Sequence, residues 1–171
     1  FTLAHEMGHS MHSYLATQNQ QFVYSNYPIF TAEVASTFNE ALLMDYLLKN
    51  SDGDKKLYLL DVYLDQINST VFRQTMFAEF EYEAHKKAEQ GLTLTAESLD
   101  KLYYEILKKY WGPDVEFDIA RSSRTWCRIP HFYYNYYVYQ YSTAFAGSTA
   151  LAEKVLSGGE KEREDYLGFM C

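Results

Sequence analysis

The side chains best suited to chemistry in this sequence lie in the stretch HEMGH, residues 5–9. On an α-helix, positions four apart differ by about 40° around the axis and about 6 Å along it, so His5 and His9 can direct two imidazoles at one metal ion. Glu6 lies beside His5 and can reach a water molecule near that ion without binding the ion itself. These are parts of a hydrolytic zinc site. The alternative is an amphipathic helix whose histidines are incidental, and further ligands would distinguish the two.

A catalytic zinc ion usually takes three ligands from the protein. One known extension of the motif has a third histidine six residues after the second, but that position holds Leu15. The remaining candidates are Glu33 and Glu40 in FTAEVASTFNEALL, because burial of an unpaired carboxylate among apolar residues is costly. They are seven residues apart and share a helix face, so one can bind the ion while the other hydrogen-bonds a histidine. The residues alone leave both assignments open, and His12 is expected to pack nearby rather than bind the ion.

Helices must position these side chains, because apolar residues recur at helical spacing through most of the chain. The fold class is therefore mainly α, with several packed helices. The expected helices cover residues 2–17, 28–48, 55–89 (ending at Gly91), 95–110 (capped by Thr95), 130–156 and a charged segment after 157–159. Residues 114–130 lack a clear period.

Composition limits the class of protein. The 171 residues suffice for one domain, residues 1–171, and a net charge of −8 argues against nucleic acid as a partner. No apolar run is long enough to cross a membrane, so no membrane partner is expected. Cys127 and Cys171 match no metal or redox spacing, which indicates a reducing compartment and hence the cytoplasm. Phe1 stands so close to His5 that we expect the chain to be part of a longer protein.

Four blocks in order, HEMGHSMH, FTAEVASTFNE, FRQTMFAEFE and RIPHFYYNYYVYQYSTAFA, resemble the thimet oligopeptidase and oligoendopeptidase F family of zinc metallopeptidases, most closely its bacterial oligoendopeptidase F branch. The resemblance runs through most of the chain. It implies a multi-helix, zincin-type catalytic domain and short peptides as substrates. Family members are longer, so it also implies that an N-terminal lobe and the end of the catalytic domain are missing here.

The resemblance further implies site residues. His5, His9 and Glu33 match the family's ligands to one zinc ion, with Glu33 24 positions after His9. Glu6 matches the general base, and Glu40 a second glutamate near the metal.

The segment HFYYNYYVYQY is rich in phenols, which are neutral hydrogen-bond donors suited to stabilising an oxyanion. Its six tyrosines cannot all face one site on a helix, so most are expected to pack in the core. The family has a histidine and tyrosines here that contact substrate. His131 matches the histidine, and Tyr139, then Tyr136, match the tyrosines as an i, i+3 pair, with Tyr133 and Tyr137 in reserve.

The sequence thus predicts a zinc-dependent endopeptidase of short oligopeptides. The alternatives are a related carboxypeptidase, and a non-catalytic helical binding fragment whose zinc is structural. Arg121, Arg124 and Arg128 are suited to binding a peptide carboxylate, although each taken singly is more readily explained by an acidic neighbour. Arg73 is expected to have a structural role beside Glu79 or Glu81.

Overall fold

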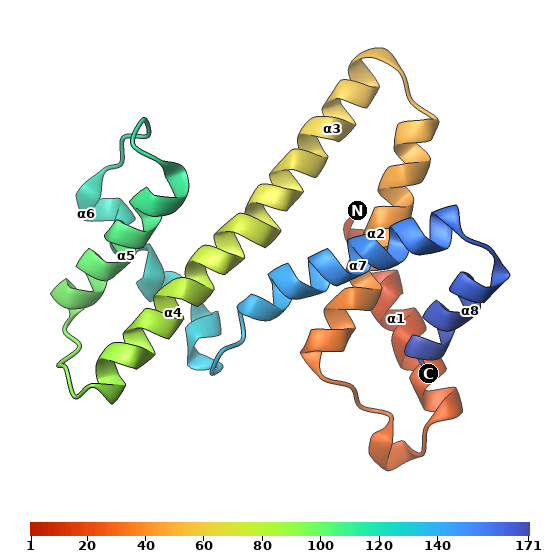
Figure 1. Cartoon of the computed structure of the whole chain (residues 1–171), viewed down its shortest axis with the longest axis horizontal. Coiled ribbons are helices and arrows are strands. Elements are labelled where there is room, and N and C mark those ends of the chain that lie inside the picture. The colour runs from red at the N-terminus through yellow and green to blue at the C-terminus, as the bar shows by residue number, and fades with distance from the viewer. The chain divides into compact units, whose positions relative to one another are not determined.

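The computed structural model describes residues 1–171 and consists of helices and loops without strands, which confirms the mainly α prediction (Figure 1). The chain divides into two compact units, one made of residues 1–71 and 140–171 and the other of residues 72–139. The expectation of one domain over residues 1–171 stays a prediction.

The first unit contains the helices α1 (Thr2–Asn19), α2 (Ile29–Lys49), α3 (Gly53–Ile67), α7 (Tyr139–Ser157, which starts at the unit boundary) and α8 (Glu160–Phe169). Its core forms where α2, α7 and α8 meet. The rings of Phe38 and Tyr166 stack there with centroids 3.7 Å apart, and the Thr37 hydroxyl donates a 2.8 Å hydrogen bond to Ser148 across the same contact. The buried core residues are Ala35, Phe38, Ala152, Tyr166 and Met170. This core fixes α2, which carries the candidate glutamates.

The second unit consists of α4 (Arg73–Glu89), α5 (Ala96–Trp111), the short α6 (Ile119–Ser122) and two 3₁₀ turns, Thr125–Arg128 and Pro130–Tyr133. Thr95 caps α5 through a reciprocal pair of hydrogen bonds with Ser98, as the sequence predicts. The apolar faces of α4 and α5 pack together, and burial of each large side chain contributes about 1.5–3 kcal/mol. The buried residues are Met76, Phe80, Leu102, Tyr103, Ile106 and Leu107.

The long helical pattern of residues 55–89 is interrupted once. A π-helical segment, Asn68–Phe72, separates α3 from α4. Within this segment, the Ser69 hydroxyl donates a 3.2 Å hydrogen bond to the carbonyl of Gln66, and such local side-chain bonds compete with helical ones. Single π-turns within helices often occur at functional sites.

The predicted helix over residues 130–156 is wrong in its first third, because α7 begins only at Tyr139. Tyr136 has a φ of +50°, a left-handed conformation that costs an L-residue about 1–2 kcal/mol. Its N–H donates a 2.7 Å hydrogen bond to Oε1 of Glu81 instead of to a helical carbonyl. Tyr136 and Tyr139 therefore do not form an i, i+3 pair on one helix.

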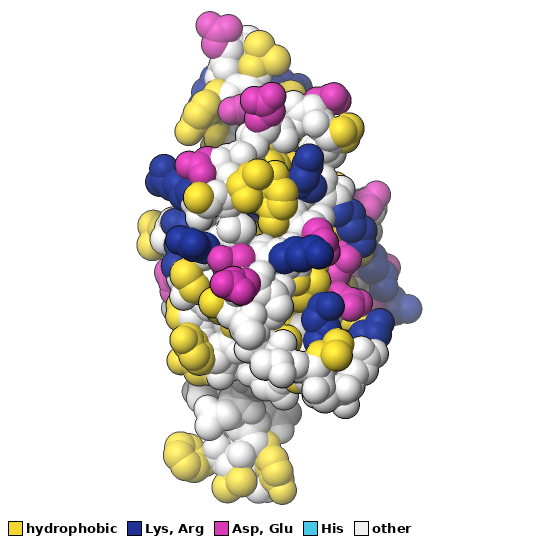
Figure 2. Space-filling model, turned by 90° about the vertical axis from the view of Figure 1, so that its left-hand side faces the viewer, with side chains coloured by type: hydrophobic (Ala, Val, Ile, Leu, Met, Phe, Trp, Pro, Cys, Tyr) yellow, Lys and Arg dark blue, Asp and Glu magenta, His cyan; other side chains and the backbone are white.

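Basic, acidic and hydrophobic side chains are interspersed over the face seen in Figure 2. None of the helices is both long and apolar enough to span a lipid bilayer.

Candidate metal centre

The backbones of α1 and α2 come close together at Gly8. A Cβ atom at this position would lie 2.5 Å from the carbonyl oxygen of Ala35 and 2.6 Å from Cα of Ser36, both of them backbone atoms of α2. A side chain of any size would force the helices apart, so glycine is required for this contact. The close approach brings the histidines of HEMGH next to Glu33.

One donor atom from each of His5, His9 and Glu33 lies within 4.8 Å of the others. Nε2 of His5 is 3.6 Å from Oε2 of Glu33, and the two imidazole rings meet edge to face with centroids 4.9 Å apart. Donors placed about 2.1 Å from a tetrahedral zinc ion are about 3.4 Å apart. The distance between Nε2 of His5 and Oε2 of Glu33 nearly matches that value, and small side-chain movements would bring the other donor pairs to it. Two imidazoles and one carboxylate form a donor set typical of catalytic zinc.

Glu33 is only 7% exposed, although it carries a carboxylate. The Ser36 hydroxyl lies 3.3 Å from its Oε2, and His5 stands on the other side of the same oxygen. A buried carboxylate with so few hydrogen bonds is costly unless a cation compensates its charge. The residues present therefore fit a divalent metal ion.

Glu40 lies behind His5 rather than among the donors. Its Oε1 is 2.9 Å from Nδ1 of His5, and the side-chain amide of Gln66 donates to its Oε2. The hydrogen bond to Glu40 raises the pKa of His5, burial opposes that rise, and the nearby carboxylate charges add to it. With its proton on Nδ1, His5 presents the Nε2 lone pair to the donor cluster. The residues alone left Glu33 and Glu40 open as ligands, and this geometry favours Glu33.

The cluster opens into a cavity of about 390 Å³. Sequence reasoning missed several residues of its lining. Gln66 belongs to a long helical pattern, and nothing local marks its pairing with a glutamate on another helix. Tyr141 is one of six tyrosines within 11 residues, and the sequence does not distinguish it from the others. The lining residues beyond the cluster are Thr37, Glu40, Gln66, Thr70 and Tyr141.

Two further side chains of α1 that could take part in chemistry, Glu6 between the histidine donors and His12 after them, differ in exposure. Glu6 is exposed to solvent and lies one residue after His5. His12 is buried and stacks on Tyr27 with ring centroids 3.6 Å apart. It lies outside the donor cluster, in agreement with the packing role expected for it.

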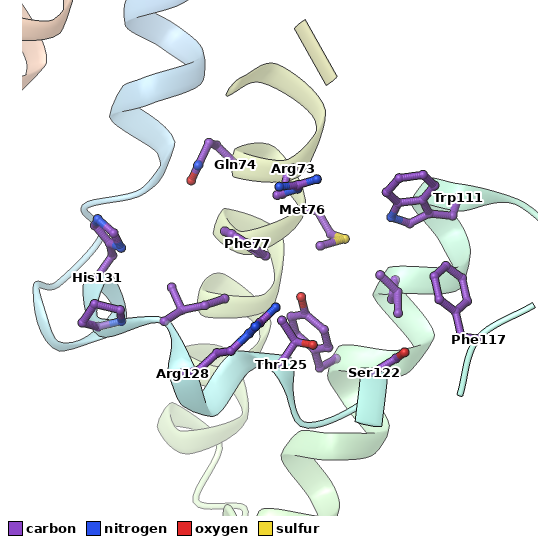
Figure 3. Close-up of a pocket in the computed structure, with 14 residues that line it drawn as sticks. Arg73, Gln74, Met76, Phe77, Trp111, Phe117, Ser122, Thr125, Arg128 and His131 are labelled. Atoms are coloured by element: carbon purple, nitrogen blue, oxygen red, sulfur yellow. The ribbon is translucent and has the colours of Figure 1, made fainter. Parts of the chain in front are cut away.

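The other predicted site residues, His131, Tyr136 and Tyr139, belong to the second unit, and their roles stay predictions. His131 lines a separate cavity there, together with Arg73 and Arg128 (Figure 3).

The arginines and their expected acidic partners are only partly paired as predicted. Arg124 pairs with Asp100, so an acidic neighbour accounts for it. Glu79 binds Lys109 and Tyr110, and Glu81 binds the backbone of Tyr136. No ion pair joins Arg73 to either glutamate, and the structural role expected for it stays a prediction.

Comparison with known proteins gives a consistent result. Residues 1–169 match peptidase family M3. The chain is 50% identical over 171 residues to the oligopeptidase PepF of Bacillus subtilis and 49% identical over 177 residues to an oligoendopeptidase F homolog of Lactococcus lactis, covering 99% of this chain in each case. A crystal structure of oligoendopeptidase-F from Enterococcus faecium superimposes with a TM-score of 0.84 at 47% identity. The chain spans 25% and 28% of the two relatives and 30% of the crystallised chain.

Proposed function

The chain belongs to peptidase family M3, and on that premise we propose that it is the metal-binding part of a zinc-dependent endopeptidase that hydrolyses short oligopeptides. The observation that carries the proposal is the donor cluster of His5, His9 and Glu33, with Glu40 hydrogen-bonded to the outer nitrogen of His5. These three side chains would hold one zinc ion per chain. When bound, the ion would act as a Lewis acid that makes water nucleophilic at neutral pH.

The remaining steps fall to side chains of the chain itself. Glu6 would accept the proton of the attacking water and pass it to the leaving amine, a transfer that its exposure and position beside His5 support. Glu40 would keep His5 in the tautomer that can bind the ion. His131, Tyr139 and Tyr136 are the proposed hydrogen-bond donors to the peptide.

Two alternatives have less support. A structural zinc site usually has four protein ligands, whereas the cluster offers three. A carboxypeptidase would use the same metal chemistry and differ only in where it cuts. The cytoplasmic location rests on the two free cysteines and stays a prediction.

The decisive experiment substitutes Glu6→Gln and Glu33→Ala in the full-length protein that contains these residues. Glu6→Gln should retain zinc and lose nearly all peptide cleavage, because the amide cannot accept a proton. Glu33→Ala should lose both, since a donor is missing. Metal content is measured by atomic absorption, and products are identified by mass spectrometry. Cleavage retained by Glu6→Gln would refute the assigned base, and release of single C-terminal residues would indicate the carboxypeptidase.

A further inference from the structure

The second unit contains a cavity of about 650 Å³ that the proposed metal chemistry does not use, apart from His131 in its lining. The cavity lies among α4, α5 and the segment that follows α5. In Figure 3, Arg73 of α4 and Arg128 of the 3₁₀ turn point into it from opposite sides. His131 lies at one end, and Trp111 and Phe117 lie at the other.

The lining combines cations with apolar walls. Phe77, Trp111 and Phe117 present aromatic surface, and none of the 14 residues that line the cavity is acidic. This composition is unusual in a chain of net charge −8, where acidic residues outnumber basic ones. It excludes a cationic ligand and favours an anionic group attached to an apolar one.

Neither arginine of the cavity has an acidic partner. The ion pairs between α5 and its neighbours join Lys109 to Glu79 and Arg124 to Asp100, and none involves Arg73 or Arg128. Acidic side chains stand among the basic ones on the face in Figure 2, whereas no acidic side chain lines this cavity.

Both guanidinium groups also affect Tyr103, a third residue in the lining of the cavity. Burial raises the pKa of the Tyr103 phenol to about 12, and the positive charges of Arg128 and Arg73 oppose that rise. Tyr103 is 2% exposed and lines the same cavity as both arginines.

We propose that this cavity binds a carboxylate of the peptide, with Arg73 and Arg128 as its ligands and the aromatic wall around the adjoining side chain. The inference rests on the proposed peptidase function and adds a substrate preference to it. A planar guanidinium matches a carboxylate through two parallel hydrogen bonds. The apolar wall favours the free α-carboxylate of an apolar C-terminal residue, because an Asp or Glu side chain offers no apolar group beside its charge.

The test compares cleavage of matched peptides of increasing length in the full-length protein. Each peptide is made with a C-terminal phenylalanine as the free acid, as the amide, and as an amide in which aspartate replaces that phenylalanine. Charged hydrogen bonds of this kind change affinity about ten- to a hundredfold. At the length that reaches the cavity, the free acid should exceed the phenylalanine amide in kcat/KM by that factor.

The variants Arg73→Gln and Arg128→Gln should reduce this preference, and the double variant should bring it close to unity. Arg124→Gln is the matched control, because Arg124 pairs with Asp100 and does not line the cavity. If the aspartate amide is cleaved as fast as the free acid, and this cleavage depends on the two arginines, the cavity binds a carboxylate and the carboxylate comes from a side chain. Equal rates for all three peptides at every length, or a preference that survives the double variant, would overturn the proposal.

Binding without turnover separates this inference from the proposed function. N-acetylphenylalanine and its amide are titrated into the same proteins by calorimetry. If the protein cleaves no peptide but binds the acid through the arginines, the peptidase assignment is refuted and the carboxylate-binding role of the cavity is supported. If the protein cleaves peptides but binds the acid and the amide with equal affinity, the carboxylate-binding role is refuted and the peptidase assignment is supported.

Discussion

Replacement of Gly8 by alanine should damage the candidate metal centre, although Gly8 is not one of the proposed metal ligands. The added Cβ would lie 2.5 Å from the carbonyl oxygen of Ala35, and ordinary van der Waals contact begins at 3.4 Å. The atoms it meets belong to the α2 backbone and cannot rotate away. The helices α1 and α2 must therefore separate by about 0.9 Å, which moves His5 and His9 away from Glu33.

The size of the effect follows from two opposing contributions. Overpacking against immobile atoms costs up to about 3 kcal/mol, whereas Gly→Ala within a helix gains about 1 kcal/mol. The variant should thus lose about 2 kcal/mol of unfolding free energy. Its zinc affinity should fall at least about tenfold. Loss of a hydrogen-bond partner behind a metal ligand already lowers metal affinity about ten- to a hundredfold, and displacement of the ligands themselves should cost no less.

Gly147→Ala in α7 is the matched control, because a Cβ there meets nothing within 4 Å. It should gain up to about 1 kcal/mol and leave zinc affinity unchanged. Both variants are measured by urea unfolding and by zinc competition against a chelator. If Gly8→Ala matches Gly147→Ala in both assays, the argument that glycine is needed for the helix contact is refuted.

Three further predictions concern carboxylates. Glu40→Ala should lower zinc affinity about ten- to a hundredfold in the same competition assay, because His5, the proposed zinc ligand, loses the hydrogen-bond partner of its outer nitrogen. Unchanged affinity would contradict this role of Glu40. Glu81 is 3% exposed and accepts a hydrogen bond from the N–H of Tyr136, so Glu81→Ala should lower the unfolding free energy in urea by about 1–3 kcal/mol. Glu81→Gln keeps an acceptor and should lower it clearly less. Equal losses in the two variants would contradict the role of this hydrogen bond. Burial alone would raise the pKa of Glu79, but hydrogen bonds from Lys109 and Tyr110 outweigh burial, and the pKa is lowered. The ionised carboxylate therefore stabilises the fold above pH 4.5, its ordinary pKa, and this stabilisation is lost as the pH falls through the lowered pKa. Unfolding measured against pH should show wild type and Glu79→Gln converging in acid, and a constant difference would rule the linkage out.

The helices that carry the metal centre could be predicted because their signals are local. Apolar spacing indicates α1 over residues 2–17, and Pro28 precedes the start of α2, which runs from Ile29 to Lys49. The spacing of His5 and His9 also gives their common face without reference to any other element.

The choice between Glu33 and Glu40 needed the structure. Both lie on one face of α2, so periodicity treats them alike. The crossing of α1 over α2 at Gly8 decides which carboxylate meets the imidazoles and which lies behind His5.

The prediction of a helix over residues 130–138 is wrong because here, too, a contact with another part of the chain decides the structure. Its apolar and aromatic pattern suits a helix, but the buried Glu81 carboxylate binds the N–H of Tyr136, whose left-handed backbone stops helical propagation. A contact between residues 55 positions apart leaves no trace in local periodicity.

The pairing of α1 with α2 has a consequence for the order of folding. The three donors and Glu40 all lie on two consecutive helices joined by a short connection, residues 20–28, so little loop-closure entropy opposes their contact. The packing of α7 and α8 on α2 must instead close a loop that contains the whole second unit. Contacts local in sequence form fast. Substitutions at the α1–α2 contact should therefore slow folding, whereas those at the stacked rings of Phe38 and Tyr166 should mainly speed unfolding.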